Sequence, residues 1–188
     1  MAQGGGVMAM ERELWDAYDR AGNLLGFDLV RGEPIPAGAF HLVAEVYAVT
    51  TDGQILVTRR HPKKPFGGLW EVTGGSVLKG EGPVEGALRE LREETGIAVS
   101  PVELCPVYVD VRDNLREGQP SIYHCFLTVF APREQAVRLQ EGETVDWKLL
   151  PCEDFRRFVL TDGFVEAVRR RFLKHREAFD RLMAECFG

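Results

Sequence analysis

One acidic segment, residues 74–97, constrains the fold of this chain more than any other feature. Pro83 stands where a first helical residue can lack its N–H, and Gly96 stands where a helix ends. Apolar residues between them recur at the helical period, so the segment predicts a loop that opens an amphipathic helix. The apolar stripe consists of Val84, Ala87, Leu88 and Leu91.

Three carboxylates gather on a neighbouring face of this predicted helix. At about 100° per residue, the helical period brings Glu90, Glu93 and Glu94 together. Arg89 lies one turn from Glu85 and Glu93, which favours a role in tethering the acids. Carboxylates this close repel one another unless a cation lies among them, and such oxygen-rich clusters suit Mg²⁺ or Mn²⁺. Taken alone, the pattern is also typical of a solvated acidic helix face.

The complete spacing of this segment resembles the Nudix box. Every position of the motif is present, reading Gly75-x5-Glu81-x7-Arg89-Glu90-Leu91-x-Glu93-Glu94-x-Gly96-Ile97. The resemblance implies a Nudix-type α/β/α sandwich with a mixed sheet, extended here by an N-terminal segment and C-terminal helices. It also implies a pyrophosphohydrolase that uses Mg²⁺ or Mn²⁺ to cleave a diphosphate linkage in a small molecule, usually a nucleoside diphosphate derivative.

The resemblance also assigns roles to individual residues. The implied metal ligands are Glu90, Glu93, Glu94 and the carbonyl of Gly74. Glu94 would be the most important ligand, and Glu90 could act as the base through a water. Arg89 would orient a carboxylate rather than touch the substrate. Gly75 would give the loop the backbone freedom that it needs.

Composition limits the classes of partner. The chain has 188 residues, of which 45% are hydrophobic and 28% charged, and its net charge is −6. This balance argues against a nucleic-acid binder with a general basic surface, and an anionic substrate would need a local basic patch. No apolar run is long enough to span a membrane and no signal peptide is recognisable, so we expect a cytoplasmic protein.

The cysteines do not indicate a zinc site. They stand far apart in the sequence, at Cys105, Cys125, Cys152 and Cys186. Scattered cysteines of this kind are typical of buried small hydrophobic residues, although the sequence alone leaves two disulfides open.

The chain divides into three parts. We expect an N-terminal tail and strand or hairpin extension over residues 1–36, the Nudix domain over 37–160, and a C-terminal helix packed on that domain over 161–188. Residues 1–9 would be a mobile tail, or Met10 would be the natural start. In the extension, residues 14–19 predict a short strand and 27–30 its hairpin partner.

Alternating apolar residues predict the strands of the domain. Asp52 and Gly53 form a hairpin turn signal between the first two of them, and a polar turn is expected over residues 114–120. The expected strands cover residues 41–50, 55–58, 99–113 (broken by Pro101 and Pro106) and 121–130.

The densest basic run of the domain follows the second strand. It contains Arg59, Arg60, Lys63 and Lys64. The run is compatible with a solvated strand end, but the nearby acids favour a phosphate clamp in which Arg59, Arg60 and Lys64 contact the substrate. Some Nudix hydrolases take a further ligand or base from a later loop. Here that loop carries Glu141 and Glu143, so Glu143 joins the substrate-binding candidates.

The C-terminal residues predict helices. Residues 153–160 predict a short helix, and Asp162 could cap a long helix that runs to about Cys186. Its apolar stripe is Phe164, Val168, Phe172, Phe179, Leu182 and Met183, and its polar face is Arg169, Arg170, Arg171, Lys174 and Arg176. We expect the stripe to pack on the domain, with a dimer contact as the alternative. The protein would be a monomer or a homodimer.

Two other functions remain open. Residues 15–23, 40–49 and 55–70 resemble the isopentenyl-diphosphate isomerase branch of the superfamily. By approximate alignment, the isomerase's catalytic cysteine falls on Gly74 and a metal-binding histidine on Ser76. Its two later glutamates fall near Tyr123 and Cys125, so only His41 matches a ligand of that enzyme.

The other alternative is a non-catalytic nucleotide-binding Nudix sensor, although such domains usually lose box glutamates and this chain has lost none. The sequence does not choose between a nucleoside diphosphate derivative and a prenyl diphosphate as substrate.

Overall fold

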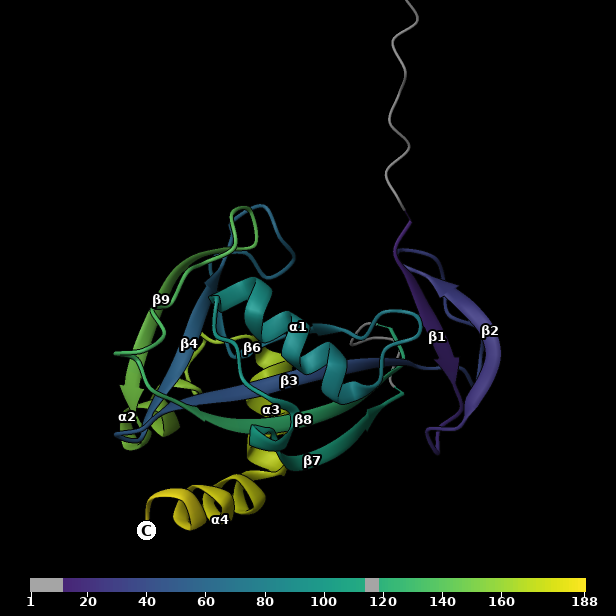
Figure 1. The fold of residues 1–188 in the computed structure, drawn as a ribbon. Helices are drawn as coiled ribbons and strands as arrows, with labels where there is room; N and C mark the ends of the chain where they lie inside the picture. The colour runs from purple at the N-terminus through teal and green to yellow at the C-terminus, as the bar shows by residue number, and fades with distance from the viewer. Residues whose placement is uncertain (1–11, 114–118) are drawn as a thin grey trace, which may run out of the picture.

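The computed structural model describes residues 12–113 and 119–188, and its centre is one mixed β-sheet (Figure 1). The order is β5–β4–β3–β8–β7, with β6 paired to β3 and β9 paired to β4. The predicted tail over residues 1–9 and most of the predicted turn over 114–120 lie outside the described residues. The strands are β3 (His41–Thr50), β4 (Gln54–Arg60), β5 (Trp70–Glu71), β6 (Thr73–Ser76), β7 (Cys105–Arg112), β8 (Ser121–Phe130) and β9 (Thr144–Pro151).

Strand β3 is the central element of the sheet. It runs parallel to β8, in a register from His41 opposite Ser121 to Thr50 opposite Phe130, and antiparallel to β4 and β6. Because side chains alternate across a strand, β3 contributes to two separate cores. Leu42, Ala44, Val46 and Ala48 belong to one core, and Tyr47 and Val49 to the other.

Helices cover both faces of the sheet (Figure 1). Helix α1 (Pro83–Thr95) packs on one face through Ala87 and Leu91, which are fully buried. Helices α2 (Cys152–Phe158), α3 (Glu166–Lys174) and α4 (Arg176–Phe187) pack on the other. The predicted α/β fold with a mixed sheet is therefore confirmed. Within the described residues, no helix has both the length and the apolar character that crossing a bilayer requires.

The prediction of one long C-terminal helix is wrong. The chain breaks at His175, whose backbone leaves the helical region at φ −114° and ψ 18°. The His175 ring stacks on Tyr108 of β7 with centroids 4.1 Å apart, so a tertiary contact accompanies the break. Asp162 caps neither piece. Its carboxylate accepts from Arg169, and α3 begins after Val165. The apolar stripe itself is buried as predicted, from Phe164 to Met183.

Arg171 was expected on the exposed polar face, and this too is wrong. Its side chain is buried and its guanidinium pairs with the buried Glu45 carboxylate of β3. Tyr108 donates a further hydrogen bond of 3.3 Å to Glu45. A charge of this kind is stable inside a protein only when it is paired, which the one-sided sequence pattern of α3 did not show.

The N-terminal extension is the predicted hairpin. Strand β1 (Leu14–Tyr18) pairs antiparallel with β2 (Leu24–Val30), and Trp15 and Leu29 are buried where the hairpin meets the domain.

Two smaller expectations are corrected. Residues 101–103 form a short 3-10 turn, η1 (Pro101–Glu103), so the strand predicted from residue 99 begins only at Cys105. All four cysteines are free thiols, but only Cys125 is fully buried, and Cys186 is exposed.

Candidate active site

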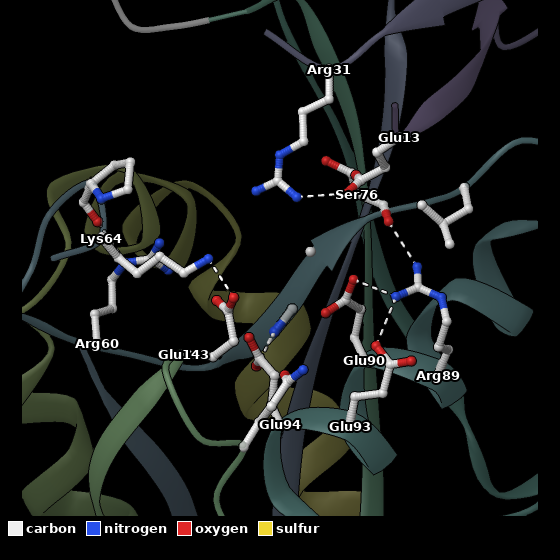
Figure 2. Close-up of a pocket in the computed structure, with 15 residues that line it drawn as sticks. Glu13, Arg31, Arg60, Lys64, Ser76, Arg89, Glu90, Glu93, Glu94 and Glu143 are labelled. Carbon is white, nitrogen blue, oxygen red and sulfur yellow. Dashed lines mark hydrogen bonds and ion pairs between the residues drawn. The ribbon is translucent and has the colours of Figure 1, made fainter. Parts of the chain in front are cut away.

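A cavity of about 440 Å³ opens beside the N-terminal hairpin, the loop between β6 and α1, and the loops after β4 and before β9 (Figure 2). It brings together most of the residues that the sequence singled out. Its charged lining residues are Glu13, Arg31, Arg60, Lys64, Arg89, Glu90, Glu93, Glu94 and Glu143.

Helix α1 places the three predicted carboxylates in this cavity. Pro83 occupies its first turn, and Gly96 ends it in the left-handed conformation with φ 74°, as predicted. Because Leu91 is buried against the sheet, the helix cannot rotate without exposing it. Glu90, Glu93 and Glu94 therefore face the cavity from neighbouring positions of α1.

Arg89 holds several carboxylates at once. Its guanidinium donates to Glu90 at 2.7 Å, to Glu93 at 3.2 Å and to the Ser76 carbonyl at 2.9 Å (Figure 2). It also donates to Glu81 at 2.8 Å. The expected tether to Glu85 does not form among the described residues. Arg89 thus fastens the loop before α1 to the acidic face of the helix.

Glu94 is the most unusual of the acids. It is only 7% exposed, yet its one hydrogen-bond partner among the described residues is the Gly74 N–H, at 3.3 Å. Burial raises the pKa of Glu94 well above its ordinary value, and Glu71 and Glu90 raise it further. No basic side chain of the described residues lies within ion-pair distance of this carboxylate. A carboxyl group buried in this way is stable when it is protonated or when a cation pairs with it.

Gly75 is needed for space rather than for backbone freedom, contrary to the expectation. It is not among the glycines with positive φ. A Cβ at this position would lie 2.4 Å from Glu90 Oε1, so only glycine leaves room for the carboxylate beside β6. Burial also raises the pKa of Glu90, opposed by the hydrogen bond from Arg89.

The donor set fits a hard divalent cation. Within residues 12–113 and 119–188, no three acidic, histidine or cysteine side chains already converge on one point. Mg²⁺, however, keeps several waters and needs only one or two protein carboxylates beside substrate phosphates. Glu94, with the Glu90 and Glu93 oxygens that Arg89 leaves unbound, supplies enough oxygen for such an ion.

Only part of the basic run lies at the cavity. Arg60 and Lys64 line the cavity, whereas Arg59 does not and donates to the Gly68 carbonyl at 2.9 Å. Lys64 pairs with Glu143 at the cavity wall, while Glu141 lies outside the lining.

Sequence reasoning missed three residues near the cavity. Glu13 and Arg31 reach it from the hairpin, and no sequence signal placed that hairpin against the loop before α1. Glu71 binds Arg60 with both oxygens at 2.6 and 2.8 Å. Burial raises the pKa of Glu71 to about 7 against the opposing charge of Arg60. An acid directly after Trp70, shortly before the box, was the signal that could have identified Glu71.

The positions of the isomerase alternative do not form a second centre. Gly74 and Ser76 line the cavity without a thiol or an imidazole. Cys125 is buried in the aromatic core, and His41 lies outside the cavity, stacked on Trp15 with centroids 4.2 Å apart. His41 is thus placed as a buried strand residue.

Comparison with known proteins identifies relatives. The NUDIX domain family model matches residues 39–174, which is more than half of the chain. An uncharacterized Nudix hydrolase of Listeria monocytogenes, lmo0368, is 36% identical over 46% of this chain and 53% of its own length. The chain therefore spans about half of the length of that relative. An isopentenyl-diphosphate Delta-isomerase of Escherichia coli is 28% identical over 76% of this chain and 82% of its own length.

Solved structures share the fold. DR0079 from Deinococcus radiodurans superimposes with a TM-score of 0.62 and 18% identity, covering 94% of this chain and 100% of that one. A bifunctional NMN adenylyltransferase/ADP ribose pyrophosphatase from Francisella tularensis, complexed with AMP and a Mn ion, gives a TM-score of 0.56 and 22% identity. That alignment covers 78% of this chain and 42% of the Francisella protein. At these identities the likeness shows the fold alone.

Proposed function

The chain belongs to the NUDIX domain family, and on that premise we propose that it is a divalent-metal-dependent hydrolase of a diphosphate linkage. The proposed substrate is a nucleoside diphosphate derivative, and the proposed metal is Mg²⁺ or Mn²⁺. The observation that carries the proposal is the buried Glu94 carboxylate, which has no ion-pair partner among the described residues and lies beside Glu90 and Glu93, in one cavity with Arg60 and Lys64.

Different residues of the cavity would bind the metal ion and the substrate. Glu94, Glu90 and Glu93 would hold the ion, which when bound neutralises phosphate charge and lowers the pKa of a water for attack on phosphorus. Arg89 fixes Glu90 through Oε1, so Oε2 remains either to bind the ion or, in place of that role, to accept a proton from the attacking water. Lys64 and Arg60 bring positive charge to the phosphate oxygens, which offsets the acidity of the cavity.

The choice of substrate class has two supports. Most of the residues that line the cavity are charged, which suits the phosphates and polar leaving groups of nucleotide derivatives. The Francisella neighbour carries the name ADP ribose pyrophosphatase and was solved with AMP and a Mn ion. Both points favour a nucleoside diphosphate derivative over a prenyl chain.

The test is a substrate screen with a matched pair of variants. Purified protein with Mg²⁺ is offered nucleoside triphosphates, nucleotide sugars, dinucleotides and prenyl diphosphates, and released phosphate products are measured. Glu94→Gln keeps the shape of the side chain but removes its charge, so turnover should fall at least about a hundredfold. Glu85→Gln changes an exposed acid of the same helix that does not line the cavity, and it should leave turnover unchanged.

Equal activity of Glu94→Gln and the parent protein would contradict the proposed site. Binding of one nucleotide without turnover of any compound would instead indicate a sensor.

The second candidate is an isomerase of isopentenyl diphosphate, favoured by the Escherichia coli relative that covers most of both chains. Glycine at residue 74 and serine at residue 76 supply neither of the groups that the resemblance requires there. The same screen separates the two reactions, because an isomerase would convert isopentenyl diphosphate without releasing phosphate.

A further inference from the structure

The N-terminal hairpin contributes two charged side chains to the cavity. Glu13 precedes β1 and Arg31 follows β2, so both stand at the open end of the hairpin. Both residues also lie outside the segment that the NUDIX family model matches, residues 39–174. They therefore reach the cavity from outside the matched segment.

The hairpin is firmly placed against the domain. Trp15 of β1 is 3% exposed and stacks on His41 of β3 at an interplanar angle of 18°. The Gly80 N–H, in the loop that leads into α1, donates to the Asp16 carboxylate at 2.7 Å. These contacts fix the hairpin to β3 and to the loop between β6 and α1, so its open end keeps a defined position at the cavity.

Arg31 is directed into the cavity by its neighbours. Its backbone N–H donates to the Glu13 carbonyl at 3.0 Å, which extends the β1–β2 ladder by one step. Its Nη1 donates to Glu13 Oε2 at 2.6 Å, and Glu13 Oε1 accepts from Trp15 Nε1 at 2.8 Å. Because both oxygens of Glu13 are engaged, the carboxylate holds the guanidinium in one direction, toward the centre of the cavity (Figure 2).

Of the three arginines that line the cavity, Arg31 has the most N–H donors without a hydrogen-bond partner among the described residues. Arg60 binds both oxygens of Glu71 and the Pro65 carbonyl, and its side chain is 22% exposed. Arg89 is 20% exposed and donates to three carboxylates and a carbonyl. Arg31 is 59% exposed and meets a single carboxylate oxygen among the described residues. A guanidinium has five N–H donors, so several remain for a ligand.

We propose that Arg31 binds a phosphate oxygen of the substrate, so that the N-terminal hairpin completes the diphosphate site opposite Lys64. Figure 2 shows the two cationic groups reaching the same space from different sides, one from the hairpin and one from the loop after β4. The inference rests on the proposed function, because it takes the anion to be the diphosphate of a substrate. Planar two-point recognition of phosphate oxygens is the task for which arginine is suited.

The test compares Arg31→Ala with Arg12→Ala. Arg12 belongs to the same hairpin segment and forms an exposed ion pair with Glu33 at 3.3 Å, but it does not line the cavity. The probe is methylenediphosphonate, which cannot be hydrolysed, titrated calorimetrically in the presence of Mg²⁺. We expect Arg31→Ala to weaken binding about tenfold, as loss of a charged hydrogen bond at a partly exposed site should. Arg12→Ala should bind like the parent protein, and Arg31→Lys should recover part of the loss.

Kinetics add a second readout. With the substrate found in the screen, Arg31→Ala should raise KM about tenfold and change kcat little, because a phosphate contact that is equally strong in the ground state and the transition state contributes to binding alone. Parent-like binding by Arg31→Ala, or an equal loss in Arg12→Ala, would overturn the proposal while leaving the hydrolase function intact. A parent protein that hydrolyses nothing but binds methylenediphosphonate more tightly than Arg31→Ala would instead refute the hydrolase function and support the role of Arg31.

Discussion

Among single residues, His41 shows how burial decides a protonation state. Ser121 Oγ donates to the Gln119 carbonyl at 2.7 Å and lies 2.8 Å from His41 Nε2, so Nε2 must carry the hydrogen and donate to Ser121. The other ring nitrogen, Nδ1, is buried and has no partner among the described residues. Burial, together with the positive charge of Arg112, lowers the pKa of His41 to about 4. The ring is therefore neutral in the folded protein.

This neutral ring predicts a loss of stability in acid. The folded-state pKa lies below the usual unfolded value of about 6.5, so the unfolded chain binds the extra proton between pH 6.5 and pH 4. The contribution of His41 is full above pH 6.5 and declines as the pH falls through this window. Between pH 7 and pH 5 the free energy of unfolding should decrease by about 2 kcal/mol from this residue alone.

Urea unfolding of the parent protein and His41→Phe, at pH 7 and pH 5, measures this contribution. Phenylalanine keeps the stacking on Trp15 but cannot take a proton, so the stability of the variant relative to the parent should improve at pH 5. A difference between the two proteins that is the same at both pH values would show that His41 titrates normally.

At the scale of elements, the site depends on a close approach between β6 and α1. Gly75 of β6 lies so near Glu90 of α1 that a Cβ would meet the carboxylate at 2.4 Å. Gly75→Ala should displace this side chain and raise the Mg²⁺ concentration for half-maximal activity about tenfold.

Gly80, in the loop between β6 and α1, provides the control for that titration. Gly80 has φ +83°, and an added Cβ would meet no other atom within 4 Å. Gly80→Ala should therefore reduce stability by about 1 kcal/mol without changing the Mg²⁺ requirement. Identical Mg²⁺ curves for Gly75→Ala and the parent would refute the steric role of Gly75.

The elements also show what could be predicted from sequence. The ends of α1, its buried stripe and the alternation of β3 depend on neighbours within a few residues, and all three were predicted. The break at His175, the pairing of Arg171 with Glu45 and the arrival of Arg31 in the cavity depend on residues far away along the chain. A periodic sequence pattern indicates which face of a helix or strand a side chain lies on. It does not indicate which other element that side chain contacts.

At the scale of the whole molecule, one buried ion pair joins the first half of the chain to the last. Arg171 of α3 and Glu45 of β3 are separated by 126 positions, and both side chains are almost fully buried. The Arg171 guanidinium also lies over the Tyr123 ring of β8, 3.8 Å from its centroid. Removing one charge leaves the other buried without a partner, which is the costly change in such a pair.

Arg171→Met should therefore lower the free energy of unfolding by about 3 kcal/mol. The double variant Glu45→Met/Arg171→Met should recover most of that loss, because it leaves no unpaired charge. Arg176→Met, which removes an exposed partner of Asp180, should cost less than about 0.5 kcal/mol. Chemical denaturation of these variants, the parent protein and Glu45→Met gives the coupling energy, and strictly additive losses would show that the pair contributes nothing as a pair.

The parallel pairing of β3 with β8 determines when the molecule can acquire its site. The two strands align residues 80 positions apart, and α1 with all its glutamates lies within the segment that their pairing closes. Closing a segment of this length lowers the conformational entropy of the chain before any contact between the two strands has formed to offset that loss. On the ribosome, the acidic helix is therefore synthesised well before the sheet that must support it is complete. A nascent chain that ends before Ser121 carries every carboxylate of the box but lacks β8, the parallel partner of β3, so the site matures late in synthesis.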